Sequence, residues 1–245
     1  MRVEQNALVL GCGRSGTSIF GELFEMLPSF DYLEEPFVDD IPARPDRPIA
    51  VKVPRLPEGV SAPAGCPLPD EVLARVPAEP RTIFWQVRHP YDAVCSLRAG
   101  IADGWGHHPR PPDWQQWLHR PVVERCAHHW ATINTLGYRQ VADVAVVNRF
   151  EDMIRDPLAT ARRAVSAVGV DDGAVQKSIE AWAARVRDTN DDQFVEARMS
   201  RRRSRPDHTR RVGRWRENLT IEDSERIRPI VAEAAATFGY SLDAT

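Results

Sequence analysis

The stretch Gly11–Ser18 reads GCGRSGTS and follows the apolar run ALVL at residues 7–10. A short apolar run that ends in glycines is typical of a buried parallel strand, and the sequence after the glycines has helical periodicity. The spacing is that of a P-loop, G-x-x-x-x-G-K-[ST], whose backbone N–H groups bind phosphate at a helix N-terminus. Position 17, however, is threonine instead of the P-loop lysine, which argues against ordinary ATP or GTP hydrolysis.

The rest of the chain alternates strand patterns with helix patterns. Strands are predicted at residues 7–10, 49–53, 82–87 and 144–147. Helices are predicted at residues 17–27, 70–76, 90–98, 122–140, 157–168, 173–186 and 221–238. Irregular connections are expected at residues 36–48, 54–69, 100–113 and 188–212. This alternation predicts an α/β fold, in which one domain spanning residues 1–245 has a parallel β-sheet flanked by helices.

The composition excludes several classes of protein. The 245 residues carry a net charge of only -3, which gives no overall field that would attract nucleic acid or an anionic membrane. We expect no membrane insertion and no signal peptide, because no apolar run approaches about 20 residues. The four cysteines, Cys12, Cys66, Cys95 and Cys126, lie far apart and are expected to be reduced thiols of a cytoplasmic protein.

The charge is distributed unevenly along the chain. Residues 197–216 contain nine arginines and one aspartate, a charge of +8, so the remainder of the chain carries -11. A basic segment on an acidic body indicates a small polyanionic ligand, although a solvated arginine-rich loop would have the same composition.

A second motif, RHPYDAVCS at Arg88–Ser96, follows the strand predicted at residues 82–87 and fits R-x-P-x-D-x-x-x-S. Ligands of open α/β sheets collect at the carboxyl ends of the strands, where this arginine would lie. Ser96 is one helical turn beyond Asp92, so the two side chains share a helix face. Arg88 and Ser96 together suit a phosphate monoester, and the alternative for the arginine is a surface ion pair.

In this order, the two motifs resemble those of the sulfotransferases that use 3′-phosphoadenosine 5′-phosphosulfate (PAPS) as donor. The resemblance implies a P-loop-NTPase-like sulfotransferase fold, in which the first loop binds the 5′-phosphosulfate and the second motif binds the 3′-phosphate. GRWRENLT, at Gly213–Thr220, resembles the family's third segment, a Gly-x-Trp with basic and Asn residues close to the cofactor. Residues 13–37 are most similar to the carbohydrate O-sulfotransferase branch and its bacterial relatives, which also have arginine at the position of Arg14.

The resemblance implies a set of cofactor-binding residues. These are Arg14, Ser15, Gly16, Thr17, Ser18, Arg88, Ser96, Arg210, Arg211 and Gly213. The family's Arg-Lys-Gly triplet is not reproduced, because His208, Thr209 and Arg210 stand there, so the arginine that contacts the 3′-phosphate stays open within residues 201–211. Specificity for PAPS over ATP would come from Arg88 and Ser96, which have no partner when the 3′-phosphate is absent.

The catalytic residues implied by the resemblance are Glu35, Arg14 and Lys52. The cytosolic branch has a catalytic histidine two residues after the lysine, but position 54 is proline here. The proposed base is therefore Glu35 in YLEEPF, which matches the Glu-Pro pair of the carbohydrate branch, with Glu34 as the alternative. No metal is expected, because the protein's own cations would stabilise the charge that magnesium covers in a kinase.

The expected reaction moves a sulfuryl group from PAPS to the hydroxyl of a sugar, natural product or other small molecule by in-line displacement. The loops at residues 36–48 and 100–113, with Trp105, Trp114 and Trp117, are expected to shape the acceptor site. Two alternatives are a P-loop nucleotide kinase, which would need the missing lysine and a magnesium-binding aspartate, and a non-catalytic nucleotide-binding module.

Overall fold

The computed structural model describes residues 5–55, 69–75, 81–102, 104–107, 109–171, 173–187 and 212–243. Within these residues, the chain forms a five-stranded sheet with the order β2-β3-β1-β4-β5. All four neighbouring strand pairs are parallel. The strands are β1 (Asn6–Gly11), β2 (Asp31–Glu34), β3 (Ile49–Lys52), β4 (Arg81–Val87) and β5 (Val146–Arg149).

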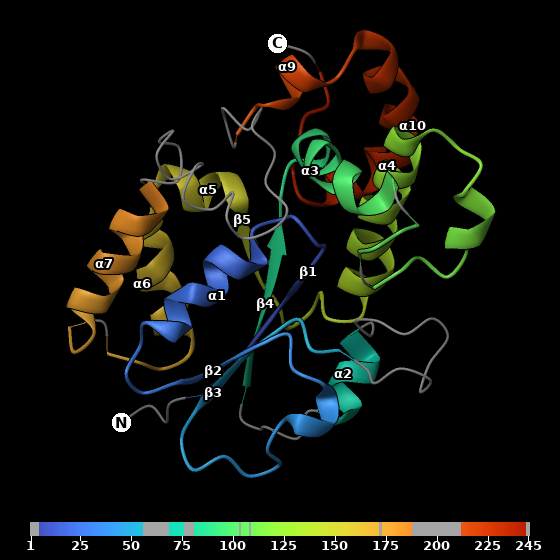
Figure 1. Cartoon of the computed structure of the whole chain (residues 1–245). Helices are drawn as coiled ribbons and strands as arrows, with labels where there is room; N and C mark the ends of the chain where they lie inside the picture. Colours follow the sequence, from blue (N-terminus) through green and yellow to red (C-terminus); the bar gives the residue numbers. More distant parts are fainter. Residues whose placement is uncertain are drawn as a thin grey trace.

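Helices cover both faces of the sheet (Figure 1). On one face lie α1 (Thr17–Glu25), α5 (Phe150–Arg155), α6 (Pro157–Ala167) and α7 (Gln176–Arg187). On the other lie α3 (Pro90–Ala102), α4 (Val122–Thr132) and α10 (Ile221–Thr237). Shorter elements are α2 (Pro69–Arg75), α9 (Trp215–Asn218), the 3-10 helices η1 (Val38–Asp40) and η2 (Trp114–Trp117), and the π-helix η3 (Ile133–Gly137).

The two faces bury separate cores because successive side chains of a strand point in opposite directions. In β1, Leu8 and Leu10 pack with α3, α4 and α10, whereas Ala7 and Val9 pack with α1, α6 and α7. This double burial explains why β1 reads as a continuous apolar run instead of an alternating one. The α/β fold with a parallel sheet flanked by helices is thereby confirmed.

The order of the strands places a topological switch point at the centre of the sheet. β1 and β4 are neighbours, and the helices that follow them, α1 and α3, lie on opposite faces. Such a switch of direction opens a crevice at the carboxyl ends of the two strands, where ligands of open α/β sheets bind. The first loop and the second motif both begin at this point.

Several predicted elements differ in detail from the structure. The edge strand β2 was not predicted, and Glu34 is its last residue instead of a loop residue. The strand predicted at residues 144–147 begins two residues later, because the amides of Val144 and Ala145 both donate to the carbonyl of Val141 in a turn. The helix expected at residues 122–140 contains the π-helical segment η3, and the short helix α5 directly after β5 was not predicted.

Cys12, Cys95 and Cys126 are buried free thiols, as the sequence predicts, and Cys66 lies outside the described residues. Burial raises the pKa of the Cys126 thiol to about 12, so this side chain is uncharged. Among the described helices, none combines the length and the apolar character that crossing a bilayer requires.

Candidate active site

The first loop connects β1 to α1 and has the geometry of an anion-binding turn. Gly16 is the N-cap of α1 with φ 93°, and a Cβ atom at this position would overlap the Phe150 ring, so the turn requires glycine. Ser15 and Thr17 are buried beside it. The loop therefore presents the N-terminus of α1, with its partial positive charge, at the carboxyl end of the central strand β1.

Lys52 connects the first loop to the two predicted glutamates. It is the last residue of β3, and its side chain is only 3% exposed. Its Nζ atom donates to Ser18 Oγ at 3.0 Å, to Glu35 Oε1 at 2.7 Å and to Glu34 Oε1 at 3.3 Å. These three acceptors match the three N–H groups of an ammonium, and the two carboxylates compensate its buried charge.

The backbone holds Glu35 on both sides. Its amide donates to the carbonyl of Lys52 at 2.9 Å, and its own carbonyl accepts from Arg55 Nε at 2.8 Å. Glu35 itself has φ 48°, a left-handed conformation that is costly for a residue other than glycine. The carboxylate is thus aimed at Lys52 by a fixed backbone turn.

Left-handed backbone conformations are concentrated at the carboxyl ends of the strands. Among the described non-glycine residues, four have positive φ, and three of them, Arg14, Glu35 and Val53, follow β1, β2 and β3. Each such residue costs about 1–3 kcal/mol and persists only where its surroundings impose it, which occurs most often at functional sites. The fourth is Trp105.

The second motif contacts the first loop directly. Arg88, at the end of β4, is 5% exposed, and its Nη1 atom donates to the carbonyl of Arg14 at 3.3 Å. Its guanidinium lies 4.5 Å from the centre of the Phe150 ring. Arg14 Nε donates to Ser96 Oγ at 3.1 Å, which joins residues 82 positions apart in the sequence. The two predicted anion-binding motifs therefore form one continuous site.

The third segment is attached to the second through Asp92. This carboxylate is 1% exposed and accepts from the Gly213 amide at 2.7 Å and from the Trp215 amide at 3.0 Å. The Trp215 ring packs edge-on against Tyr91, with ring centres 5.1 Å apart, and parallel to His89 at 5.9 Å. Arg210 and Arg211, which the sequence places before this segment, lie outside the described residues.

One residue near the first loop was missed by the sequence analysis. A Cβ atom at Gly13 would lie 3.7 Å from His107 Nδ1, so the loop after α3 brings this imidazole beside the glycine turn. The neighbouring Trp105 is fully buried and donates from Nε1 to His129 Nδ1 at 3.1 Å, so it offers no exposed wall to an acceptor. No sequence spacing signals His107, because its position depends on how the loop folds back.

The described residues contain no group of three or more His, Cys, Asp or Glu side chains arranged to hold a metal ion.

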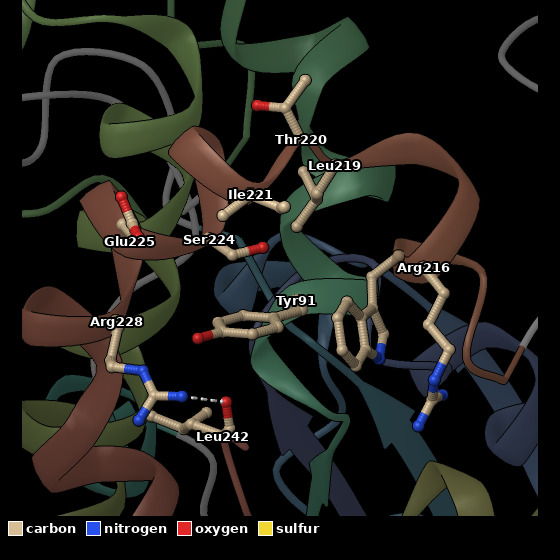
Figure 2. Close-up of a pocket in the computed structure, with 10 residues that line it drawn as sticks. Tyr91, Arg216, Leu219, Thr220, Ile221, Ser224, Glu225, Arg228 and Leu242 are labelled. Atoms are coloured by element: carbon tan, nitrogen blue, oxygen red, sulfur yellow. Dashed lines mark hydrogen bonds between the residues drawn. The ribbon is translucent and has the colours of Figure 1, made fainter. Parts of the chain in front are cut away.

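A separate pocket of about 390 Å³ lies between α3, α9 and α10 (Figure 2). It is lined by Tyr91, Trp215, Arg216, Leu219, Thr220, Ile221, Ser224, Glu225, Arg228 and Leu242. Figure 2 shows Arg216 and Arg228 at opposite ends of this pocket, with Arg228 donating to the Leu242 carbonyl at 2.7 Å. Of the predicted cofactor-binding residues that the structure describes, none is among these lining residues.

The chain matches no protein-family model and no curated protein in sequence. In structure it is similar to mouse sulfotransferase SULT7A1 complexed with PAP, with a TM-score of 0.60 and 16% identity over 95% of this chain and 84% of that chain. The chain has the sulfotransferase fold. Sulfotransferase STF9 from Mycobacterium avium is also similar, with a TM-score of 0.54 and 15% identity over 100% of this chain and 79% of that chain.

A third structure with the sulfotransferase fold is retinol dehydratase in complex with androsterone and inactive cofactor PAP. Its TM-score is 0.51, with 12% identity over 96% of this chain and 82% of that chain. The shared fold extends over nearly the whole chain in all three comparisons, in agreement with the extent of the motifs in the sequence.

Proposed function

We propose that this protein is a PAPS-dependent sulfotransferase that transfers a sulfuryl group to the hydroxyl of a small molecule. The observation that carries the proposal is the contact between the two anion-binding motifs, through Arg14, Ser96 and Arg88, at the carboxyl ends of β1 and β4 in a sulfotransferase fold. The SULT7A1 and retinol dehydratase structures are both complexes with PAP. A continuous site with one buried and one loop arginine suits a nucleotide that carries two separate phosphates.

In this proposal the two ends of the donor have different ligands. The first loop, Arg14–Ser18, and Lys52 bind the 5′-phosphosulfate, where backbone N–H groups, hydroxyls and cations surround the charge. Arg88 and Ser96 bind the 3′-phosphate, with Gly213 and the arginines Arg210 and Arg211 of the preceding segment. Contrary to the expectation that Arg88 and Ser96 lack partners without the 3′-phosphate, both contact Arg14 in this structure, so discrimination would come from the charge-assisted hydrogen bonds that a 3′-phosphate adds.

Glu35 is the proposed general base. The acceptor oxygen forms a bond to sulfur as the bond between sulfur and the 5′-phosphate oxygen breaks, and Glu35 takes the acceptor's proton. Lys52 and Arg14 stabilise the negative charge that develops on the departing phosphate oxygen. Lys52 contacts both Glu35 and Ser18, so the base is held at a fixed place relative to the first loop.

The finer assignments rest on sequence features. The Glu35–Pro36 pair and Arg14 support the carbohydrate O-sulfotransferase branch and its bacterial relatives, and with it a sugar hydroxyl among the candidate acceptors. We propose that residues 1–245 form one sulfotransferase domain. The free, buried thiols of Cys12, Cys95 and Cys126 support a cytoplasmic location, because disulfides are rare there.

A thermal-shift comparison of adenosine 3′,5′-bisphosphate with ADP and AMP tests the donor. At a hundred times its Kd, the bisphosphate adds about 2.7 kcal/mol of stability, which raises Tm by about 5–10 °C in a protein of this size. ADP and AMP should give much smaller shifts at the same concentration. Equal stabilisation by ADP, or turnover of ATP with magnesium, would favour a kinase and contradict the proposal.

A mass-spectrometric screen of acceptors with PAPS then tests the transfer itself. Sugars, phenols and other hydroxylated small molecules should include at least one that gains the mass of a sulfuryl group. Tight binding of the bisphosphate without turnover over a broad acceptor panel would instead indicate a non-catalytic nucleotide-binding module.

A further inference from the structure

The segment that follows the proposed base pairs with the segment that follows β3. The amide of Arg55 donates to the carbonyl of Pro36 at 2.7 Å, and the amide of Val38 donates to the carbonyl of Arg55 at 2.8 Å. These two bonds form a parallel bridge between Phe37 and Arg55, just beyond the ends of β2 and β3. Because Phe37 is two residues after Glu35, the bridge fixes both side chains beside the proposed base.

The Arg55 side chain has one fixed and one open part. Its Nε atom donates to the carbonyl of Glu35 at 2.8 Å, which anchors the guanidinium. Its two Nη atoms make no hydrogen bond or ion pair with any described residue, and the side chain is exposed. The nearby carboxylates of Glu34 and Glu35 bind Lys52 instead. The remaining N–H groups of the planar fork suit a carboxylate, sulfate or phosphate group of a ligand.

Phe37 adds an apolar surface at the same place. Its ring centre lies 5.1 Å from the Arg55 guanidinium carbon, a distance at which the ring attracts the cation. At 40% exposure, Phe37 is the most exposed phenylalanine, tyrosine or tryptophan in the described part of the chain. We call these two residues the acceptor platform, since a ring can stack on Phe37 while a charged substituent reaches Arg55.

The position of the proposed base determines what the acceptor platform can contact. A general base must lie within about 3 Å of the acceptor oxygen whose proton it takes, so a small acceptor has to lie against Glu35. Arg55 is bonded to the backbone of that residue, which places it within reach of a substituent on the same acceptor ring. The carboxylates of Glu34 and Glu35 and the phosphosulfate would repel an anionic acceptor, so a cation is needed for its binding.

We infer that Arg55 selects acceptors that carry an anionic group near the reacting hydroxyl, and that Phe37 supports the ring of such an acceptor. This inference rests on the proposed function and narrows its acceptor to a class. Acidic sugars and hydroxylated aromatic acids both combine a ring, a hydroxyl and a carboxylate. Arg55 lies outside the loops that the sequence predicts to shape the acceptor site, residues 36–48 and 100–113.

Two matched pairs of probes test the inference, with PAPS as the donor. One pair is meta-hydroxybenzoate and meta-hydroxybenzamide, and the other is para-nitrophenyl β-glucuronide and its amide. Within each pair the carboxylate is replaced by an uncharged group of similar shape. In at least one pair, the unmodified protein should have a kcat/KM about 10-fold or more higher for the acid, the worth of a charged hydrogen-bonded contact. The pair that shows this preference distinguishes aromatic acids from acidic sugars.

Variants locate the preference in the acceptor platform. Arg55→Met should reduce the acid-to-amide ratio of kcat/KM by about 10-fold or more. If Arg55 only held the backbone of Glu35, this variant would lower kcat for both members of a pair and leave the ratio unchanged. Phe37→Leu should raise KM for both members and keep the ratio. The matched control is Arg163→Met, which removes the same charge from the exposed side of α6 and should change neither rate nor ratio.

The outcomes separate this inference from the proposed function. If no compound of the probe set or of the wider acceptor screen gains a sulfuryl group, the proposed function fails regardless of Arg55. If transfer occurs but every acceptor lacks an anionic group, or Arg55→Met keeps the preference for the acid, the inference is wrong. An anionic acceptor found only in the screen is compared with its own amide in the same way.

A second variant covers a failure of Arg55→Met to fold, as judged by circular dichroism. Arg55→Lys keeps the charge but loses the planar fork and the Nε contact, so the acid-to-amide ratio should still fall. An unchanged ratio in this variant would overturn the inference.

Discussion

Lys52 joins the proposed base and the proposed donor site through one ammonium group. Its shortest contact is to Glu35, at 2.7 Å, whereas Glu34 lies at 3.3 Å. Ser18, at the start of α1, is bound by the same nitrogen. A cation in this position can stabilise the charge that develops on the donor while its contact with Glu35 positions the proposed base, so one side chain serves both parts of the reaction.

We expect Glu35→Gln to lower kcat by at least about 100-fold, because a positioned general base contributes 10²- to 10⁴-fold to a rate. The Kd for adenosine 3′,5′-bisphosphate should change little, since glutamine keeps the shape of the side chain and the first loop is intact. Initial rates with PAPS and an acceptor, together with calorimetry of the bisphosphate, provide the measurement.

Glu34→Gln is the matched control for this prediction. This variant removes the same charge next to Lys52 but keeps Glu35, which makes the shorter contact to Lys52 and is held by its backbone. We therefore expect kcat to fall far less. A large loss in Glu34→Gln with normal turnover in Glu35→Gln would reverse the assignment of the base.

The sequence could identify the pair of glutamates but not their geometry. The stretch YLEEPF contains both residues. How each carboxylate faces Lys52 depends on the register of β2 with β3, which pairs Glu34 with Lys52. That register belongs to a strand that no local pattern predicted. The contact between Arg14 and Ser96 could not be predicted from the sequence either. It forms because β1 and β4 are neighbours in the sheet, which brings the segments that follow them together.

At the scale of elements, the C-terminal residues pack over the start of α3. His89 Nδ1 accepts from the Tyr91 amide at 3.3 Å, and His89 Nε2 lies 3.1 Å from the carbonyl of Ser241, to which it can donate. Glu151 accepts from the His89 amide at 2.8 Å and from the Tyr240 hydroxyl at 2.7 Å. These contacts fit the neutral imidazole with its proton on Nε2.

This docking predicts a loss of stability in mild acid. Burial lowers the pKa of His89 below its usual value, assisted by the charge of Arg216 and opposed by the Ser241 carbonyl, Asp92 and Glu151. The unfolded chain therefore binds a proton more readily than the folded one, so stability falls as pH drops below about 6.5, by at most about 1.4 kcal/mol per pH unit for one proton.

Urea unfolding at pH 7.5 and pH 5.5 measures this effect. His89→Gln has no group that titrates in this range, so its stability should change less between the two pH values than that of the unmodified protein. Parallel pH dependence in the two proteins would show that His89 is not responsible.

The elements that the sequence predicted well are those whose burial is periodic over many residues. α1, α3, α4 and α10 each bury one apolar stripe, and β1 and β4 are buried on both faces. β2 was missed because its four residues, DYLE, begin and end with exposed acids and pair only with β3 at the sheet edge. In the π-helical segment η3, Asn134 accepts from Trp85 Nε1 at 3.0 Å across the core, a tertiary contact that no local pattern signals.

For the molecule as a whole, the position of the site follows from the strand order. β1 lies between β3 and β4, so the loops that follow these three strands meet at one edge of the sheet, with Arg14, Lys52 and Arg88 at their beginnings. No local pattern in a sequence states which strands are neighbours. The resemblance of the motifs implied the sulfotransferase fold without stating a strand order, and the structure agrees with it at the level of the fold.

The uneven charge of the chain predicts that nucleotide binding depends on salt. Residues 197–216 carry +8, whereas the remainder carries -11, and the proposed ligand has one phosphate more than AMP. Because salt shortens the Debye length from about 10 Å at 0.1 M to about 3 Å at 1 M, it weakens the long-range attraction between this segment and an anion. The ligand with more charge should lose more affinity.

We therefore expect the affinity for adenosine 3′,5′-bisphosphate to fall more steeply than that for AMP between 0.05 and 0.5 M NaCl, with a slope of log Kd against log salt about twice as large. Calorimetry at three salt concentrations measures both slopes, and uncharged adenosine gives the baseline. The double variant Arg210→Met, Arg211→Met should reduce the slope for the bisphosphate more than that for AMP, because it removes charge proposed to face the 3′-phosphate. Equal slopes for the two nucleotides would mean that the basic segment acts elsewhere, and the 3′-phosphate site would then be formed by the described arginines alone.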